Sequence, residues 1–397
     1  MMRRCAAGCA LLLALFTGAL TAISADSWEL QYQHLDKEYD LRLIDVAFID
    51  ARRGLAIGFI DSREQERQRP VNLVTVDGKT WSLFEVKRMC TDVFALPSGI
   101  LFAACEDGIY RSDEMGKDWK RTARLRSIVG LWFLNERQGF AVGTEKGLYI
   151  TQDGGNRWAP VTPNPEIRTN KDYTVLRHIA FAGQKAGFIT GWNRPPRGRE
   201  PLPDWLDPDR AMRQRDTPHV NIFLDTADGG ATWNTQEVSM FGEVVSTKPG
   251  ADGIGLTLVN FSNGFEFPSE VFAFTWPKGQ MQRAYREKHR AITDVAVPPK
   301  GYVYLAAVEP TGQLYWSPIP GKLRVIRSVD FVKWEEMEVD YRASARRARL
   351  EAFDENNIWI VTDTGMILKL KREEDLPARV PPRRSQERPA QSTAAPQ

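Results

Sequence analysis

The amino-acid sequence predicts an all-β fold, a seven-bladed β-propeller, on three observations. A turn motif that ends in tryptophan recurs at intervals of about 40 residues. Short segments rich in β-branched and aromatic residues precede each copy, in the number that four-stranded blades require. A further segment near the N-terminus can supply the one strand that the last repeat lacks. Six and eight blades are the alternatives, because the fifth repeat, between Phe241 and Arg290, is degenerate.

The first 25 residues have the three-part layout of a secretory signal peptide. Arg3 and Arg4 supply positive charge, an apolar core covers positions 9–20, and small residues follow as far as Ala25. This core is too short to span a bilayer, and no cysteine follows it to carry a lipid anchor. We therefore expect a soluble protein, exported to the periplasm or the extracellular space, whose mature chain begins near Ala25 or Asp26.

One propeller domain is expected between the signal peptide and a C-terminal tail, over residues 26–375. From Leu376 to the end, the chain is mainly proline, arginine, glutamine, serine and alanine. Such a composition cannot offset the entropy cost of ordering, so residues 376–397 are expected to be disordered. The net charge of +2 says little about partners, and the distribution of charge says more.

Two cysteines remain after the signal peptide, Cys90 and Cys105. Positions 91–96 and 100–104 are expected to form two strands around a Pro-Ser-Gly turn, which places the cysteines opposite each other. Because exported chains meet an oxidising compartment, we expect a disulfide, with two buried free thiols as the alternative. The spacing typical of metal-binding cysteines is absent.

The recurring motif combines an aspartate, glycine and tryptophan at fixed spacing. Copies at 151–158 and 226–233 match closely, and looser copies lie at 75–81, 112–119 and 328–334. The carboxylate can accept backbone N–H groups of its own turn, glycine permits a positive φ, and tryptophan packs between sheets. A structural role is therefore expected for Asp77, Trp81, Glu114, Gly116, Trp119, Asp153, Gly155, Trp158, Asp228, Gly230, Trp233, Asp330 and Trp334.

The repeats divide the chain into six blades and part of a seventh. The six are expected at 42–86, 91–122, 127–162, 176–240, 243–286 and 291–340. The fifth lacks the motif, although Trp276 marks its hairpin. The seventh has three expected strands, at 347–353, 358–362 and 366–371. Positions 28–32 are similar to the strand that follows each motif, so we expect this N-terminal strand to complete the last blade and close the ring.

The motif copies resemble Asp-boxes, the turns of BNR-repeat propellers such as sialidases. The order of a signal, an N-terminal strand beginning with tryptophan, and boxed blades resembles the photosystem II stability and assembly factor family over roughly 28–371. The resemblance implies an exported assembly factor that holds a membrane-protein client. The degenerate fifth blade, the long fourth blade and the tail depart from the family pattern.

Basic residues concentrate in the connections between blades. These connections and the loops joining the second and third strands emerge on one face of a propeller, and four such loops are long, at 61–70, 193–218, 262–270 and 309–322. Concentration in one class of loop would focus positive potential on that face, although exposed arginines are often merely solvated. The candidate partner-binding residues are Arg121, Arg124, Arg126, Arg194, Arg197, Arg199, Trp205, Arg283, Arg286, Arg346, Arg347 and Arg349.

Two classes of function fit this sequence. The first is a non-enzymatic, monomeric binding protein that captures a membrane or envelope protein through an acidic segment or a carboxyl terminus. It needs no cofactor or metal, and neither nucleic acid nor a stable membrane anchor is expected. The alternative is an Asp-box glycoside hydrolase, sialidase-like or glucanase-like, which needs placed carboxyl groups or a tyrosine nucleophile with three arginines. No catalytic residue is assigned, and His34, His178, His219 and His289 show no metal-ligand spacing.

Overall fold

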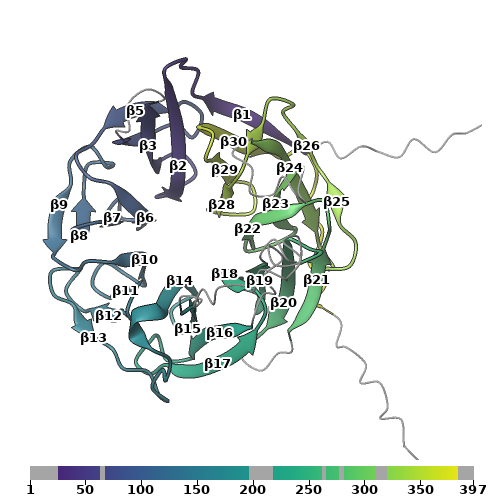
Figure 1. The fold of residues 1–397 in the computed structure, drawn as a ribbon. Helices are drawn as coiled ribbons and strands as arrows, with labels where there is room; N and C mark the ends of the chain where they lie inside the picture. The colour runs from purple at the N-terminus through teal and green to yellow at the C-terminus, as the bar shows by residue number, and fades with distance from the viewer. Residues whose placement is uncertain are drawn as a thin grey trace, which may run out of the picture.

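The chain forms a ring of seven sheets, six of them antiparallel and one with a single parallel strand pair, around a central channel (Figure 1). The structure is a computed structural model, which describes residues 26–62, 68–195, 218–261, 265–276, 281–309 and 320–382. The seven-bladed propeller predicted from the repeats is confirmed, and the degenerate fifth repeat forms a regular four-stranded blade. The expected signal peptide, residues 1–25, lies outside the described residues.

The first four blades each contain four strands in sequence order, from the channel outward. Blade 1 is β2 (Tyr39–Phe48), β3 (Gly54–Ser62), β4 (Gln68–Thr75) and β5 (Ser82–Glu85). Blade 2 is β6 (Cys90–Ala95), β7 (Leu101–Cys105), β8 (Gly108–Ser112) and β9 (Lys120–Ala123). Blade 3 is β10 (Ile128–Phe133), β11 (Gly139–Gly143), β12 (Leu148–Thr151) and β13 (Ala159–Pro160). Blade 4 follows a 3₁₀ turn, η1 (Lys171–Tyr173), and is β14 (Thr174–Ala182), β15 (Ala186–Asn193), β16 (His219–Thr226) and β17 (Asn234–Met240).

The last three blades include the segments that close the ring. Blade 5 is β18 (Glu243–Pro249), β19 (Ile254–Asn260), β20 (Ser269–Thr275) and β21 (Gln282–Arg286). Blade 6 is β22 (Ala291–Ala296), β23 (Val303–Glu309), β24 (Gly321–Ser328) and β25 (Glu335–Glu336), with β27 (Ser344–Ala345) also paired to β24. Blade 7 is β28 (Ala348–Ala352), β29 (Ile358–Thr362), β30 (Met366–Lys371), β1 (Ser27–Gln33) and β26 (Glu338–Val339).

The N-terminal strand β1 completes blade 7, as the sequence predicted. It runs antiparallel to β30 and parallel to β26, so both ends of the chain meet in one sheet. Trp28 is 1% exposed, and its indole N–H donates to the sulfur of Met337 at 3.3 Å. This closure covers the outer edge of β30 and links the N-terminal segment to the last blade.

The innermost strands share a β-bulge, present in β2, β6, β10, β14, β18 and β22. In three blades the residue after the bulge is an aspartate whose carboxylate accepts a backbone N–H of the next blade. These bonds run from Val93 to Asp45 (3.1 Å), from Leu131 to Asp92 (2.8 Å) and from Leu350 to Asp294 (3.0 Å). Neighbouring blades are therefore held in register around the channel.

The aspartate turns staple the outer hairpins through hydrogen bonds within each turn. Asp153 accepts the N–H of Arg157 at 2.9 Å, and Asp228 accepts that of Thr232 at 3.0 Å. Equivalent bonds involve Asp77 and Asp330, whereas no such bond to the Glu114 carboxylate occurs in the described residues. The first residue of each turn adds a hydroxyl that accepts a backbone N–H, in Thr75, Ser112, Thr151, Thr226 and Ser328.

Aromatic rings pack blade against blade behind these turns. Trp233 of blade 4 sets its edge against Phe140 of blade 3, with ring centroids 5.8 Å apart. Phe48 of blade 1 stacks on Trp359 of blade 7 at 3.6 Å. Such contacts add to the apolar burial that stabilises the ring.

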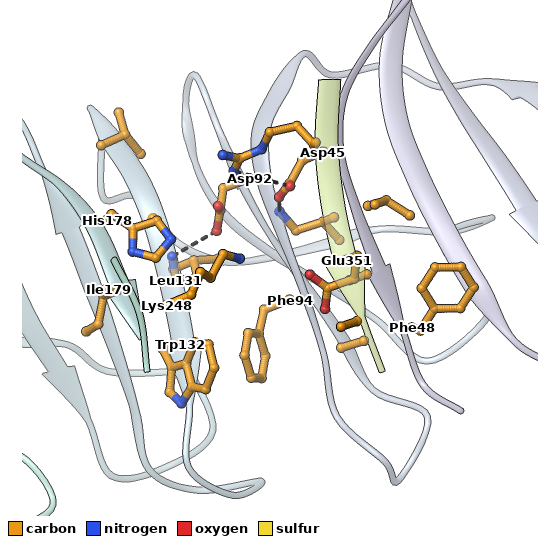
Figure 2. Close-up of a pocket in the computed structure, with 18 of the residues that line it drawn as sticks. Asp45, Phe48, Asp92, Phe94, Leu131, Trp132, His178, Ile179, Lys248 and Glu351 are labelled. Atoms are coloured by element: carbon orange, nitrogen blue, oxygen red, sulfur yellow. Dashed lines mark hydrogen bonds and ion pairs between the residues drawn. The ribbon is translucent and has the colours of Figure 1, made fainter. Parts of the chain in front are cut away.

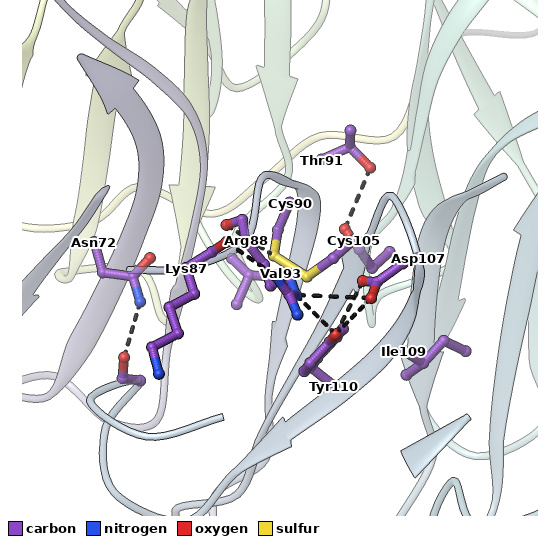
Figure 3. The surroundings of a disulfide bond; sticks show 12 residues. Asn72, Lys87, Arg88, Cys90, Thr91, Val93, Cys105, Asp107, Ile109 and Tyr110 are labelled. Carbon is purple, nitrogen blue, oxygen red and sulfur yellow. Dashed lines mark hydrogen bonds and ion pairs between the residues drawn. A yellow bond between two sulfur atoms is a disulfide. The ribbon is translucent and has the colours of Figure 1, made fainter. Parts of the chain in front are cut away.

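Cys90 and Cys105 face each other across the β6–β7 hairpin and are joined by a disulfide (Figure 3). Beside it, the Tyr110 hydroxyl donates to Asp107 at 2.9 Å and accepts from Arg88 at 3.2 Å. The bridge therefore ties the start of an innermost strand to its neighbour, close to the entry into blade 2.

The tail is described as far as residue 382 and packs on blades 5 and 6. The Arg379 guanidinium donates to the carbonyls of Gly301 (2.8 Å) and Pro298 (2.7 Å) and pairs with Asp252 at 2.7 Å. The Val380 N–H donates to Val329 at 2.9 Å. Residues beyond 375 therefore contact the propeller, because one arginine can donate to several carbonyls at once. Residues 383–397 lie outside the described part.

Candidate functional site

Most of the arginines predicted to bind a partner form ion pairs within the protein. The pairs are Arg121 with Asp107 (3.0 Å), Arg194 with Glu243 (2.7 Å), Arg283 (4.0 Å) and Arg286 with Glu270, Arg346 with Asp363 (3.1 Å), and Arg349 with Asp45 (3.5 Å). Much of the positive charge expected on this face is thus neutralised locally.

The strands also change where some of these arginines lie. Arg121 belongs to β9, and Arg283 and Arg286 belong to β21, so all three lie on outer strands and not in the connections between blades. Arg124 and Arg126 do lie in a connection and are exposed. Arg197, Arg199 and Trp205 lie outside the described residues.

Three arginines from opposite sides of the ring gather at the mouth where the innermost strands begin. Arg177 comes from β14, Arg349 from β28, and Arg347 directly precedes β28. Burial lowers the pKa of Arg177, and repulsion from Arg349 and Arg347 lowers it further, against attraction from Asp92 and Asp45. The Arg347 side chain is exposed, and among the described residues its guanidinium has no ion pair. We call Arg177, Arg347 and Arg349 the mouth arginines.

A cavity of about 280 Å³ lies within the channel below this mouth (Figure 2). Its walls come from the innermost strands of blades 1, 2, 3, 4, 5 and 7. The lining combines acidic, basic and aromatic side chains: Asp45, Asp92 and Glu351; Arg177, Lys248 and Arg349; Phe48, Phe94, Trp132 and Phe353. We call this space the channel cavity.

Ionisation in the channel cavity is shifted by burial. Burial raises the pKa of Asp92 to about 8, and repulsion from Asp45 adds to this effect. Burial raises the pKa of Glu351 to about 7, although attraction from Lys248 opposes it. Burial also lowers the pKa of His178, and Lys248 repels its protonated form. Such shifted groups in a concave site are typical of binding sites, and they also occur in structural networks.

Apart from Arg349, the charged and aromatic residues of the channel cavity were missed by the sequence analysis, although a signal for some of them exists. Asp45, Asp92 and Asp294 are each followed by valine and then by alanine or phenylalanine, near the middle of the first strand of a blade. This short repeat marks the bulge aspartates that bond to the next blade. Lys248 and Glu351 carry no comparable signal.

The fold and this axial site define the class of seven-bladed β-propellers with a charged central channel. No known protein family matches the chain by sequence, and no curated protein matches it. Among solved structures, it is similar to YCF48 bound to D1 peptide, at 16% identity and a TM-score of 0.56, covering 90% of this chain and 100% of that one. YCF48 from Cyanidioschyzon merolae is similar at 15% identity and a TM-score of 0.56, covering 86% and 98%.

The extracellular domain of a putative one component system from B. thetaiotaomicron also shares the fold, at 12% identity and a TM-score of 0.53. That match covers 88% of this chain and 40% of that one. These likenesses establish the fold, and they agree with the resemblance noted from the repeats. Within the described residues, no helix has the length and apolar character needed to cross a membrane.

Proposed function

We propose that this chain is an exported, non-enzymatic binding protein that captures a membrane or envelope protein client at the mouth of the channel. The gathering of the mouth arginines carries the proposal. Like charges held together on a rigid ring keep a positive potential at one place. Carboxylates of a client segment would relieve that repulsion and accept bidentate hydrogen bonds from the exposed Arg347 guanidinium, whereas Arg349 keeps its ion pair with Asp45.

Three further observations support this assignment. The leader at 1–25 has the layout of an export signal. A propeller of the same fold, YCF48, has been solved bound to a D1 peptide, so peptide binding is one use of this architecture. The exposed Arg124 and Arg126, in the connection between blades 2 and 3, would extend the basic surface beyond the mouth.

The glycoside hydrolase alternative rests on the same arginines, because sialidases hold a sugar carboxylate with three of them. The carboxylates of the channel cavity argue against a glycoside hydrolase. Asp45 and Asp92 each accept a backbone N–H from a neighbouring blade, which leaves Glu351 as the one cavity carboxylate without such a bond in the described residues. A panel of chromogenic glycosides tests this alternative, and turnover of any of them would revive it.

The binding proposal is tested by pull-down from the native envelope at low and high salt, read by mass spectrometry. Arg347→Glu reverses a mouth charge without removing an internal ion pair. Arg137→Glu is the matched control, because Arg137 is exposed in the β10–β11 turn at the opposite end of the channel. A client that is lost at high salt and with Arg347→Glu, but retained with Arg137→Glu, supports the proposal. Equal capture by both variants rejects it.

A further inference from the structure

Four side chains of the channel cavity hold equivalent positions on their innermost strands. Phe94, Trp132 and Glu351 each directly follow the residue whose backbone N–H is bound by the preceding blade. Lys248 follows the bulge of β18 at the same spacing as Phe94 follows the bulge of β6. Blades 2, 3, 5 and 7 therefore present these four residues at one level of the channel.

Lys248 and Glu351 are oppositely charged neighbours that do not pair. Within the described residues, neither the Lys248 ammonium nor the Glu351 carboxylate has a hydrogen bond or an ion pair. Yet attraction from Lys248 is the largest effect of any charge on the pKa of Glu351, so the two groups lie near each other without contact. Figure 2 shows both side chains directed toward the same open space.

The opposite wall of this level is aromatic. The Phe94 and Trp132 rings lie 5.2 Å apart between centroids, and both line the channel cavity with Phe353, which is 38% exposed. A volume of about 280 Å³ is at the lower end of the range for small-molecule pockets. The cavity therefore offers an apolar surface on blades 2 and 3 opposite a cation and an anion on blades 5 and 7.

We propose that the channel cavity binds a small zwitterion with an apolar body, of the class of free amino acids with a large apolar side chain. The ligand carboxylate pairs with the Lys248 ammonium, and the ligand ammonium pairs with the Glu351 carboxylate. The apolar side chain packs on Phe94 and Trp132. The ammonium and carboxylate of an amino acid are adjacent and opposite in sign, so they can lie between the Lys248 and Glu351 side chains and pair with both. Arg177 and Arg349 also line this cavity, but the groups that hold the ligand are distinct from Arg347, the mouth arginine on which the test of client capture depends.

Isothermal titration calorimetry with four probes tests each part of the site. L-Phenylalanine has both charges and the ring, phenethylamine lacks the carboxylate, 3-phenylpropionate lacks the ammonium, and glycine lacks the ring. L-Phenylalanine is expected to bind, and each probe that lacks one feature is expected to bind more weakly by a factor on the order of ten.

Two variants complete the design. Lys248→Met is expected to weaken the binding of L-phenylalanine and 3-phenylpropionate most. Binding of phenethylamine should fall less, and only because the pKa of Glu351 rises when the lysine is lost. Glu351→Gln is expected to weaken the binding of L-phenylalanine and of phenethylamine, and to leave the binding of 3-phenylpropionate unchanged. Lys185→Met, at an exposed lysine in the β14–β15 turn, is the control and should bind like the wild type. Unchanged thermal unfolding establishes that each variant is folded.

Three results would overturn the proposal. These are no binding of L-phenylalanine by the folded wild type, equal binding of all four probes, and loss of the same probes in both cavity variants. Client capture is tested through Arg347, so none of these three results would contradict the proposed function. Conversely, a failure to capture a client would not contradict amino-acid binding in the channel cavity.

Discussion

Replacing Asp26 with alanine is expected to destabilise the closed ring strongly. Asp26 is fully buried just before β1, and its carboxylate accepts hydrogen bonds from two backbone N–H groups and two guanidinium groups. The donors are the N–H groups of Glu373 (2.7 Å) and Glu374 (3.0 Å) and the guanidinium groups of Arg327 (2.8 Å) and Arg372 (2.6 Å). One carboxylate thus joins the N-terminal segment to blade 6 and to the chain after β30.

The size of the effect follows from what alanine would leave behind. The Arg327 side chain is 2% exposed and would lose a buried partner, although Glu374 (2.9 Å) and Glu335 (3.2 Å) remain beside it. Breaking a buried pair by removing one partner costs about 3–5 kcal/mol. The remaining carboxylates favour the lower part of this range, and the two orphaned backbone N–H groups favour the upper part.

Urea denaturation followed by tryptophan fluorescence measures this loss as a lower midpoint at an unchanged slope. Asp36→Ala is the matched control, because Asp36 is an exposed aspartate that accepts the N–H of Glu38 and of Tyr39 in a surface turn. The control is expected to lose less than about 1 kcal/mol. A midpoint for Asp26→Ala equal to that of Asp36→Ala would refute the role given to the buried carboxylate.

Three further perturbations address other parts of the structure. Changing both Cys90 and Cys105 to serine should cost about 3 kcal/mol, the loop-closure value for a separation of 15 residues; urea midpoints equal to that of the oxidised wild type would contradict this. Burial raises the pKa of Glu351 from 4.5 to about 7. The urea midpoint of the wild type should therefore decrease as the pH rises across that range, and the midpoint of Glu351→Gln should decrease less. Hydrogen bonds from Thr232 lower the pKa of Asp228 from 3.8 to about 2. Asp228→Ala should therefore lower the urea midpoint at pH 7, and the variant's midpoint should fall less than that of the wild type between pH 4 and pH 2. An unchanged dependence of the midpoint on pH in this range would contradict the stabilising role given to Asp228.

The sequence predicts the parts of the fold that depend on local spacing. The turns ending in Trp158 and Trp233 mark hairpins because aspartate, glycine and tryptophan each have a task within a few residues. The N-terminal strand around Trp28 is recognisable because it mimics the strand after each turn. Cys90 and Cys105 fall opposite each other because hairpin register is a short-range property.

The channel and the state of the arginines depend on closure and register, which spacing does not reveal. Arg177 and Arg349 are far apart in the chain and meet only because the ring closes. A bulge shifts β18 by one residue whereas β28 has none, so the level shared by Lys248 and Glu351 cannot be counted from the strand starts. Arg286 and Glu270 are direct partners on adjacent strands, and their ion pair depends on a register that shifts again only two residues further along β20, so spacing alone does not reveal it.

Site-specific photo-cross-linking tests the central claim most directly. Glu145 and Glu136 are exposed residues of blade 3, in the β11–β12 turn at the mouth and in the β10–β11 turn at the opposite end. A photo-reactive amino acid placed at one or the other position would be irradiated in the native envelope. Capture of a client at the mouth predicts a salt-sensitive adduct from position 145 and none from position 136. An adduct from position 136 alone would contradict the account.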